Sequence, residues 1–578
     1  MKLIRRVTFS RMKLRLARLY GAERAEELAD RLYMIIGRYG VQPRDGFETG
    51  AEAVKWSEKD VVLITYGDMI QRRREKPLVT LKNFCDRRLR GAINGVHVLP
   101  FSPSSSDGGF SVIDYREVEP SMGGWLEIER LGRDYKLMVD LVLNHCSRES
   151  EWFKSYVNGV APYDQYFIEE DPSQEWLKGV TRPRPWPLLS PTDTADGEKH
   201  VWTTFSADQV DVNWKCPNVL FDFIDILLDY VARGAVIVRL DAVAFLWKEE
   251  GTNCIHLPLT HEVIKLFRDV LRTVSPHVVL LTETNVPHEE NVSYFGEGDE
   301  AQMVYNFALP PLLLHALLRG DSQYLQKWAR GLGDLPEGCT YFNFTASHDG
   351  IGVRSLYDLV PDGEVEWVIE RVKERGGLVS YRAMPDGSES PYEMNITYRS
   401  ACEVLGNPDL GARRFICSQA VMLAMAGIPG VYFHSIVGEH NWVEGPDLEG
   451  GVKRDINRRR LGWRELEELL DDPEGEAGWI SNVYAAMLRA RRDCAAFHPD
   501  GRQEILETEG SVFAFVRDAP DESRQVLCLF NFSEEECVVP ESFVERAIGH
   551  LPKRDLLRRR PIEDWDWKLG GYGCAWLE

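Results

Sequence analysis

Eight short apolar segments, separated by longer amphipathic or loop-forming stretches, dominate the middle of this 578-residue chain. Alternation of buried strands with helical segments is typical of β–α units in a parallel sheet. Eight such units spread over roughly 380 residues favour an α/β fold of the (β/α)8 barrel type, with insertions. The predicted strands are residues 61–66, 95–99, 136–143, 235–240, 278–282, 303–306, 340–344 and 430–433.

The segments around this repeat predict the remaining organisation of the chain. Two stretches inside the barrel are too long for ordinary loops and follow strand ends, where barrel enzymes build their sites. Short alternating strands near the C-terminus predict an antiparallel β domain. The predicted units are a helical extension (1–55), the barrel (56–146 and 213–495), an inserted domain B after strand 3 (147–212), an inserted loop region after strand 7 (350–412) and the β domain (496–578).

Charge and cysteine content limit the partners and the compartment. The formal net charge of −23 argues against a general nucleic-acid binder or a binder of anionic membranes. We find no run of 18 apolar residues, and the basic N-terminus has no continuous apolar stretch, so neither a membrane helix nor a secretory signal is expected. Eleven scattered cysteines without a CxxC pair favour a reducing cytoplasm. A homodimer is compatible with these features.

Ionisable side chains gather where the predicted strands end. Asp140 and His145 stand at the end of the third strand, Asp241 at the fourth and Glu283 at the fifth. His348 and Asp349 follow the seventh strand. The barrel prediction brings four carboxylates and two histidines to one mouth, and burying them together costs free energy unless partners and a substrate offset it. This cluster is therefore the candidate active site.

Arg239 adds a specific electrostatic expectation. It lies two residues before Asp241, and residues i and i+2 share one face of a strand. A fixed cation there would hold Asp241 ionised, as a carboxylate nucleophile requires.

Four motifs carry a family resemblance: DLVLNH (140–145), VRLDAV (238–243), LTETN (281–285) and SHDG (347–350). In order and spacing they resemble the conserved regions of the α-amylase superfamily of glycoside hydrolases and transglycosylases. Longer stretches, among them PFSPSSSDGGFSVIDY, RPRPWP and KRDINR, resemble the sucrose phosphorylase-like subfamily, whose members transfer glucose to phosphate. Within it, overall length and the stretch LWKEEGTNCIHLPLTHEV are most similar to the members that act on glucosylglycerate.

The resemblance implies a retaining double displacement with a covalent β-glucosyl-enzyme. In it Asp241 is the nucleophile, Glu283 the acid/base, with a raised pKa, and Asp349 the stabiliser of the transition state. Arg239 orients Asp241. The other glucose-side residues implied are Asp107, Phe110, His145 and His348, with Gln209 near the acceptor.

Phosphate is the implied second substrate, and an acidic protein must supply cations for it locally. The candidates are Arg182, Arg184, Arg382 and Arg454. A carboxylate acceptor such as D-glycerate would suit Tyr381 and Arg382 beside Arg184. The segment 375–392 departs from the Gln- and Asn-rich pattern of the sucrose enzymes, which argues against sucrose as the donor. The resemblance to the members that act on glucosylglycerate implies 2-O-α-D-glucosyl-D-glycerate as the donor and α-D-glucose 1-phosphate as a product.

Three alternatives stay open. First, the protein could use the same mechanism on sucrose or sucrose 6′-phosphate. Second, it could be a hydrolase or transglucosylase, which would need no phosphate. Third, it could be a barrel without catalytic activity that serves only for binding. No cofactor and no metal are expected; Asn144 resembles a calcium ligand of many α-amylases, which the phosphorylases do without. The expected partners are therefore a small glucoside and phosphate, without nucleic acid or membrane.

Overall fold

The computed structural model describes residues 6–40, 56–384, 388–448, 450–562 and 568–578. At its centre, eight parallel strands close into a barrel in the order β1-β16-β12-β11-β10-β9-β4-β3. The predicted fold class is confirmed, and the predicted strands differ from the observed ones by at most two residues at either end. The barrel strands are β1 (Val62–Thr65), β3 (Gly95–Val98), β4 (Lys136–Val142), β9 (Ala235–Asp241), β10 (Val279–Thr282), β11 (Met303–Tyr305), β12 (Thr340–Asn343) and β16 (Ile428–Tyr432).

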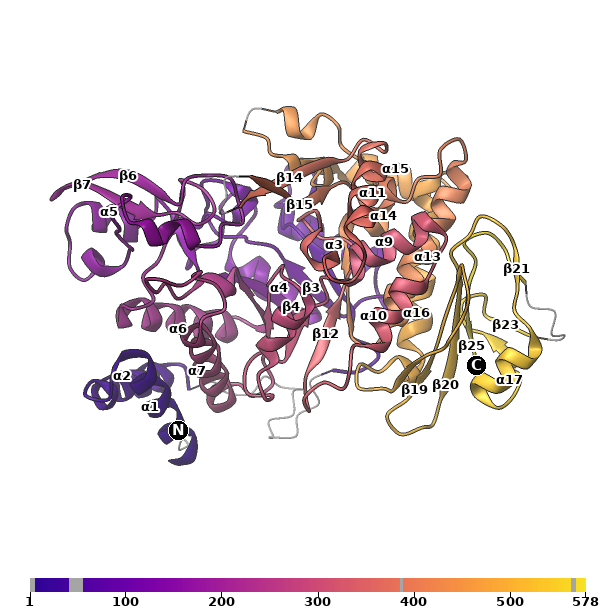
Figure 1. Cartoon of the computed structure of the whole chain (residues 1–578), viewed down its shortest axis with the longest axis horizontal. Helices are drawn as coiled ribbons and strands as arrows, with labels where there is room; N and C mark the ends of the chain where they lie inside the picture. The colour runs from indigo at the N-terminus through magenta and orange to yellow at the C-terminus, as the bar shows by residue number, and fades with distance from the viewer. Residues whose placement is uncertain (1–5, 41–55, 385–387, 449, 563–567) are drawn as a thin grey trace.

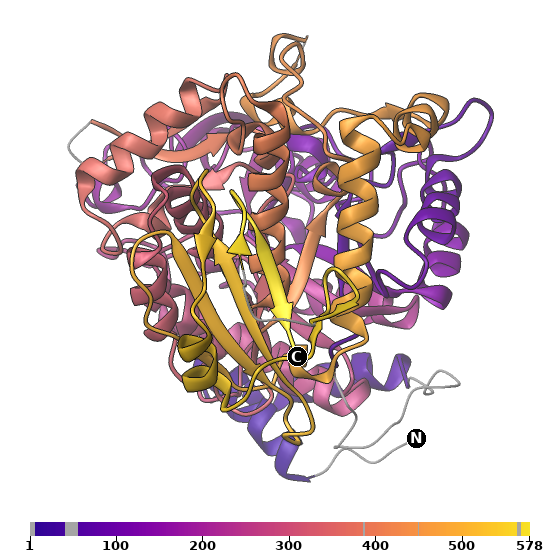
Figure 2. The same cartoon turned by 90° about the vertical axis from the view of Figure 1, so that its right-hand side faces the viewer.

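Helices surround the barrel and lie between its strands in the sequence (Figures 1 and 2). Several begin with proline in the first turn, where the missing N–H costs no hydrogen bond. The helices are α3 (Pro77–Arg88), α4 (Trp125–Asp134), α6 (Pro217–Ala232), α7 (Pro258–Val274), α8 (His288–Val292), α9 (Leu309–Arg319), α10 (Gln323–Arg330), α13 (Pro408–Ala424), α14 (Phe433–Val437), α15 (Trp463–Asp471) and α16 (Glu476–Arg492). A two-stranded pair, β2 (Ile70–Gln71) and β17 (Leu461–Gly462), joins two of the loops.

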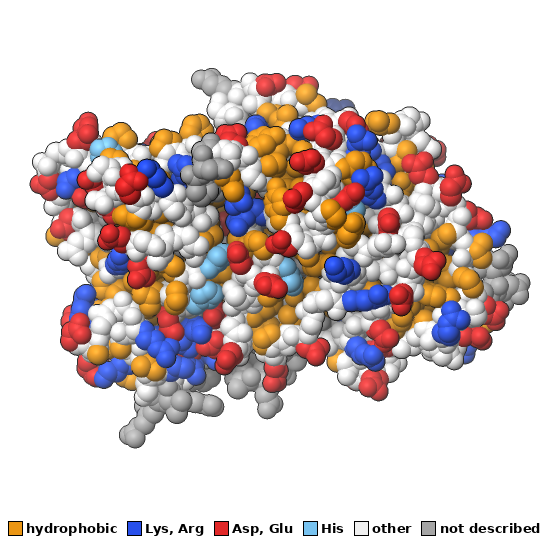
Figure 3. All heavy atoms as spheres, in the orientation of Figure 1, with side chains coloured by type: hydrophobic (Ala, Val, Ile, Leu, Met, Phe, Trp, Pro, Cys, Tyr) orange, Lys and Arg blue, Asp and Glu red, His pale blue; other side chains and the backbone are white. Residues whose placement is uncertain are grey.

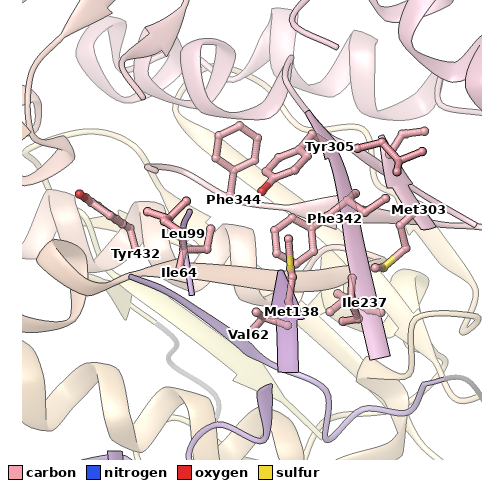
Figure 4. Packing of buried hydrophobic residues seen from close by; sticks show 14 of the residues in the cluster. Val62, Ile64, Leu99, Met138, Ile237, Met303, Tyr305, Phe342, Phe344 and Tyr432 are labelled. Atoms are coloured by element: carbon pink, nitrogen blue, oxygen red, sulfur yellow. The ribbon is translucent and has the colours of Figure 1, made fainter. Parts of the chain in front are cut away.

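The barrel interior is filled by side chains from facing strands. Figure 4 shows Ile64, Met138, Ile237 and Phe342 converging inside it, and all four are at least 94% buried. Opposite Phe342, a Cβ on Gly430 would lie 2.5 Å from the aromatic ring. The glycine therefore makes room for a large neighbour, and the barrel below the site is a packed core rather than a pore.

The N-terminal extension forms two helices, α1 (Arg6–Tyr20) and α2 (Ala25–Arg38), which lie against α6 and α7 at one lower edge of the molecule (Figure 1). Apolar side chains of α1 are buried there, and Arg15 Nε donates to Asp269 Oδ2 at 2.7 Å. Tyr20 donates its hydroxyl to the carbonyl of Trp214. The extension is thus fixed to the barrel by a buried ion pair and apolar contacts. Residues 1–5 and 41–55 of the predicted extension lie outside the described residues.

Both long insertions contain strands whose positions the sequence analysis did not predict. The first carries the hairpin β6 (Leu189–Thr194) and β7 (Gly197–Trp202), together with β5 (His145–Ser147), β8 (Gln209–Asp211) and α5 (Glu151–Val157). The second forms a three-stranded antiparallel sheet in the order β13-β15-β14. Its strands are β13 (Ile351–Gly352), β14 (Leu378–Ala383) and β15 (Glu389–Asn395), and α11 (Asp362–Lys373) and α12 (Tyr398–Ala401) complete the segment.

The C-terminal segment is an antiparallel sheet of six strands in the order β18-β19-β20-β25-β22-β23, and Figure 2 shows it facing the viewer. Trp576 on β25 is fully buried and contacts the ring of Phe497, so it belongs to the core. The elements are β18 (Gln503–Ile505), β19 (Val512–Asp518), β20 (Gln525–Asn531), β21 (Cys537–Val538), α17 (Glu541–Ile548), β22 (Arg554–Asp555), β23 (Arg560–Pro561), β24 (Lys568–Leu569) and β25 (Cys574–Leu577).

Candidate active site

Asp241 and Glu283 are brought together by the register of two neighbouring strands. Asp241 is the last residue of β9, and Glu283 directly follows β10, which pairs with β9 through Leu240 and Thr282. The backbone N–H of Ala242 donates to Glu283 Oε2 at 3.2 Å. Because parallel strands present their carboxyl ends at one mouth, the fold itself places these two carboxyl groups side by side.

Arg239 lies beneath them as a buried cation. Its Nη1 donates to Asp241 Oδ1 at 2.7 Å and to Asp140 Oδ1 at 2.5 Å. Asp140 also contacts His97 at 2.7 Å. His97 and Arg239 lower the pKa of Asp140 to about 2 against the effect of its burial. Asp140 was expected at the mouth, but it does not line the cavity; it anchors Arg239 from below.

Asp349 is held by a second set of arginines. Arg454 Nη1 lies 2.5 Å from Asp349 Oδ1, and the same guanidinium binds Glu393 on β15 through Nε and Nη2. His348 Nε2 approaches Asp349 at 3.4 Å. Despite burial, Arg454 and Arg239 hold the pKa of Asp349 below its usual range. Arg454, expected as a phosphate ligand, is thus already engaged by two carboxylates. The ring of His348 is neutral, since burial lowers its pKa well below the usual value.

The opposite wall is built from the loop after β3 and from β5 and β8. Phe110 stacks on His348, with ring centroids 4.8 Å apart. His145 Nε2 lies 2.9 Å from the Phe110 carbonyl, and Gln209 donates to Asp107 Oδ2 at 3.2 Å. All five residues line the same cavity as Asp241 and Glu283. The structure therefore brings this part of the predicted site together around one apolar ring and several polar edges.

Burial sets the protonation of the central pair. Desolvation raises the pKa of Asp241, and the negative charge of Glu283 raises it further, whereas Arg239 opposes both effects. Desolvation also raises the pKa of Glu283. A direct hydrogen bond from Arg239 favours the ionised form of Asp241, while Glu283 receives only a backbone N–H. These hydrogen bonds therefore favour Glu283 as the site of a proton bound by the pair.

Asn144, which resembles a calcium ligand of many α-amylases, is hydrogen-bonded within the chain. Its Oδ1 accepts a hydrogen bond from Lys248 Nζ at 2.7 Å, and the same ammonium lies 2.6 Å from Asp211. A cation of the chain itself therefore occupies the polar junction between β4 and domain B. Among the described residues, no group of three or more histidine, cysteine or acidic side chains is placed to hold a metal ion.

The acceptor side of the cavity differs from the expected one. Arg184 lines it, as predicted, but Arg182, Tyr381 and Arg382 do not. β14, which carries Tyr381 and Arg382, is an edge strand of its sheet, and the residues of this sheet region that line the cavity come from β15 and from the turn after β13. Polar lining residues that the sequence analysis did not assign to the site include Asn285, Arg354 and Tyr392.

Some signals for the missed residues were present in the sequence. Arg354 lies five residues after Asp349, and Asn285 lies two residues after Glu283. Both therefore follow barrel strands whose ends carry a candidate catalytic carboxylate. Tyr392 and Glu393, by contrast, reach the site through the folding of the second insertion. No periodicity indicated which strand of that hairpin would face the barrel.

The eight-stranded barrel and the carboxylate cluster at its mouth define an α-amylase-type catalytic domain, and residues 91–349 match the family model described as "Alpha amylase, catalytic domain". The chain is 48% identical to a glucosylglycerate phosphorylase of Spirochaeta thermophila over 98% of both chains. It is 43% identical to one from Escherichia coli, over 90% of this chain and 92% of the relative. It belongs to the phosphorylase branch of the α-amylase family formed by such relatives.

A solved structure is also similar in fold. The crystal structure of sucrose 6F-phosphate phosphorylase from Thermoanaerobacter thermosaccharolyticum has a TM-score of 0.71 at 25% identity, covering 82% of this chain and 94% of that one. In the described part of the chain, moreover, every helix is too short or too polar to cross a membrane.

Proposed function

We propose that this protein is a retaining glycoside phosphorylase that transfers glucose from 2-O-α-D-glucosyl-D-glycerate to phosphate. The products would be α-D-glucose 1-phosphate and D-glycerate. The observation that carries the chemistry is Asp241, bound by Arg239, next to a buried Glu283 on the neighbouring strand. The choice of donor rests on the similarity to glucosylglycerate phosphorylases along nearly the full chain.

In the first step, Asp241 attacks the anomeric carbon of the bound glucosyl group. Arg239 binds Oδ1, which leaves Oδ2 to form the bond to carbon 1. Glu283 gives its proton to the glycosidic oxygen as the bond to glycerate breaks. Retaining enzymes hold such carboxyl groups about 5–5.5 Å apart, a separation too small for a water molecule to act between them.

In the second step, phosphate takes the place of glycerate. A phosphate oxygen attacks carbon 1, the bond to Asp241 breaks, and the proton of the phosphate returns to Glu283. Asp349, kept ionised by Arg454, stabilises the positive charge that develops on the sugar in both steps. Asp107, Phe110, His145 and His348 would enclose the glucosyl ring, with Gln209 holding Asp107.

The phosphate needs a cation that the protein has not already neutralised. Arg184 from domain B lines the cavity and makes no hydrogen bond or ion pair with any described residue. Arg454, in contrast, is bound to Asp349 and Glu393. Arg184 is therefore the phosphate ligand in this proposal, and Arg454 is a positioning residue for Asp349.

The test is release of α-D-glucose 1-phosphate from glucosylglycerate, sucrose and sucrose 6′-phosphate, each with and without phosphate. We expect phosphate-dependent release from glucosylglycerate, with retention of the α configuration. Equal formation of free glucose in the presence and absence of phosphate would contradict the phosphorylase proposal. Faster release from a sucrose donor would keep the mechanism and overturn the donor assignment.

A further inference from the structure

Arg354 is a cation of the cavity wall that has no counterion among the residues the structure describes. It follows β13, at the start of a short 3-10 turn over residues 354–356, and its side chain lines the cavity with Asp241 and Glu283. Within the described residues it makes no hydrogen bond and no ion pair. A guanidinium left unpaired beside a polar cavity is available to an anionic group of a ligand.

The surroundings of Arg354 are themselves basic. Arg382 lies close enough for its pKa to be lowered, first by burial and then by the charge of Arg354, and its Nε is buried without a hydrogen-bond partner. Arg184 lines the same cavity from domain B. In Figure 3, blue side chains are visible between domain B and the β14–β15 hairpin. Glu290, 47% exposed and bound to His256, is the acidic group nearby.

The backbone places this cation beyond the acid/base residue. Gly352 on β13 lies against Asn285, and a Cβ on the glycine would be 2.7 Å from Asn285 Oδ1. Asn285 stands two residues after Glu283 and also lines the cavity, and its Oδ1 is buried without a partner. The segment that carries Arg354 is therefore fixed against the loop that carries the proposed proton donor, Glu283.

We propose that Arg354 selects a leaving group with a carboxylate next to the glycosidic oxygen, by binding that carboxylate. The inference rests on the proposed function and extends it to the recognition of the acceptor. In a 2-O-glucosylglycerate the carboxylate is attached to the carbon that bears the scissile oxygen. When Glu283 protonates that oxygen, the carboxylate lies just beyond it, where Arg354 and Asn285 form the wall. A planar guanidinium binds a carboxylate through two parallel hydrogen bonds, which a neutral alcohol does not reproduce.

Glycerol provides the matched comparison, because it replaces the carboxylate of glycerate by a hydroxymethyl group. The experiment runs the reaction from α-D-glucose 1-phosphate to D-glycerate or to glycerol, and compares kcat/KM for the two acceptors. For Arg354→Gln we expect the preference for glycerate over glycerol to fall about 10- to 100-fold, the range for loss of a charged hydrogen-bond partner. An effect on donor binding cancels in this ratio, because both acceptors receive the same glucosyl group.

Two further variants make the result specific. Arg354→Lys keeps the positive charge but lacks the two parallel N–H donors of the guanidinium, and we expect it to retain part of the preference for glycerate. It also serves as the test variant if Arg354→Gln does not fold. Arg182→Gln, in the same domain B loop as Arg184 but outside the cavity lining, should leave the ratio unchanged. An unchanged ratio in folded Arg354→Gln would overturn the inference, and so would a rise in the KM for phosphate alone.

The wild-type protein separates this inference from the proposed function. If it does not form glucosylglycerate from α-D-glucose 1-phosphate and glycerate, the proposed function fails. If it does, and Arg354→Gln keeps its preference for glycerate, only the role of Arg354 fails.

Discussion

The two sides of the cavity are built in different ways: the donor side, where the glucosyl group would bind, and the acceptor side, where glycerate or phosphate would bind. On the donor side, three of the four strand-end carboxylates are tied to a buried cation: Asp140 and Asp241 to Arg239, and Asp349 to Arg454. The fourth, Glu283, accepts a backbone N–H. On the acceptor side, Arg184 and Arg354 line the wall without counterions among the described residues. The first arrangement fixes geometry in advance of the reaction, and the second leaves charge for anions that come and go.

The origin of the residues differs in the same way. Donor-side carboxylates come from barrel strand ends, whose positions follow from the closed sheet. The acceptor side depends on the two insertions, through Arg184 and the sheet of β13, β14 and β15. Specificity carried by insertions on a shared barrel is compatible with the different substrates in the names of the relatives that match most of the chain.

Replacing Asp241, the proposed nucleophile, should produce the largest effect on the donor side. Asp241→Asn keeps the size of the side chain and its place above Arg239 but cannot form the glucosyl-enzyme. We expect glucose 1-phosphate release to fall by at least about 1,000-fold, because the reaction loses its covalent path. Initial rates measure the loss, and an unchanged circular dichroism spectrum shows that the variant is folded. Retention of more than a tenth of the activity would exclude Asp241 as the nucleophile.

Glu393 tests whether the second insertion supports the donor side. In Glu393→Gln, Arg454 loses the carboxylate that holds it beside Asp349. We expect kcat to fall about tenfold or more, with a smaller change in KM, since the misplaced group acts on the transition state. Glu389→Gln, at the exposed start of the same strand, is the control and should match the wild type. A pure KM effect in Glu393→Gln would place this residue in acceptor binding instead.

Comparing variants of Arg184 and Arg182 tests which arginine of the acceptor side binds phosphate. Arg184→Gln should raise the KM for phosphate about tenfold, as expected for loss of a charged hydrogen bond. Arg182→Gln should leave that KM nearly unchanged, because Arg182 does not line the cavity. Steady-state kinetics with varied phosphate separate the two variants, and equal effects would show that the domain B loop binds phosphate differently.

A change of pH should produce the smallest effect, with kcat/KM for the glucoside changing by about a few-fold near neutrality. Glu283 must be protonated to release the first product, and burial raises its pKa. Raising the pH removes this proton, so kcat/KM for the glucoside should decline on the alkaline side. Because Arg454 and Arg239 lower the pKa of Asp349, that carboxylate stays ionised well into the acid range. An alkaline limb that persists in Glu283→Gln, measured with a donor carrying an activated leaving group, would assign the limb to another residue.

Sequence patterns predicted the barrel and the strand-end carboxylates because both depend on local apolar runs and on a regular topology. The role of Asp140 beneath the mouth was not predictable, because strand ends do not show the depth of a side chain. Tyr381 and Arg382 were assigned to the wall from composition alone. The order β13-β15-β14, which puts Arg354 and Tyr392 at the cavity instead, depends on how the hairpin folds back on the barrel.

The most direct test of the account is isotope exchange between labelled inorganic phosphate and α-D-glucose 1-phosphate, without glycerate or any glucoside. If Asp241 forms a glucosyl-enzyme, and phosphate can leave and enter the side of the cavity lined by Arg184 and Arg354, the label should enter glucose 1-phosphate at a rate comparable to turnover. Exchange that occurs only after addition of glycerate would contradict a donor side that works independently of the acceptor.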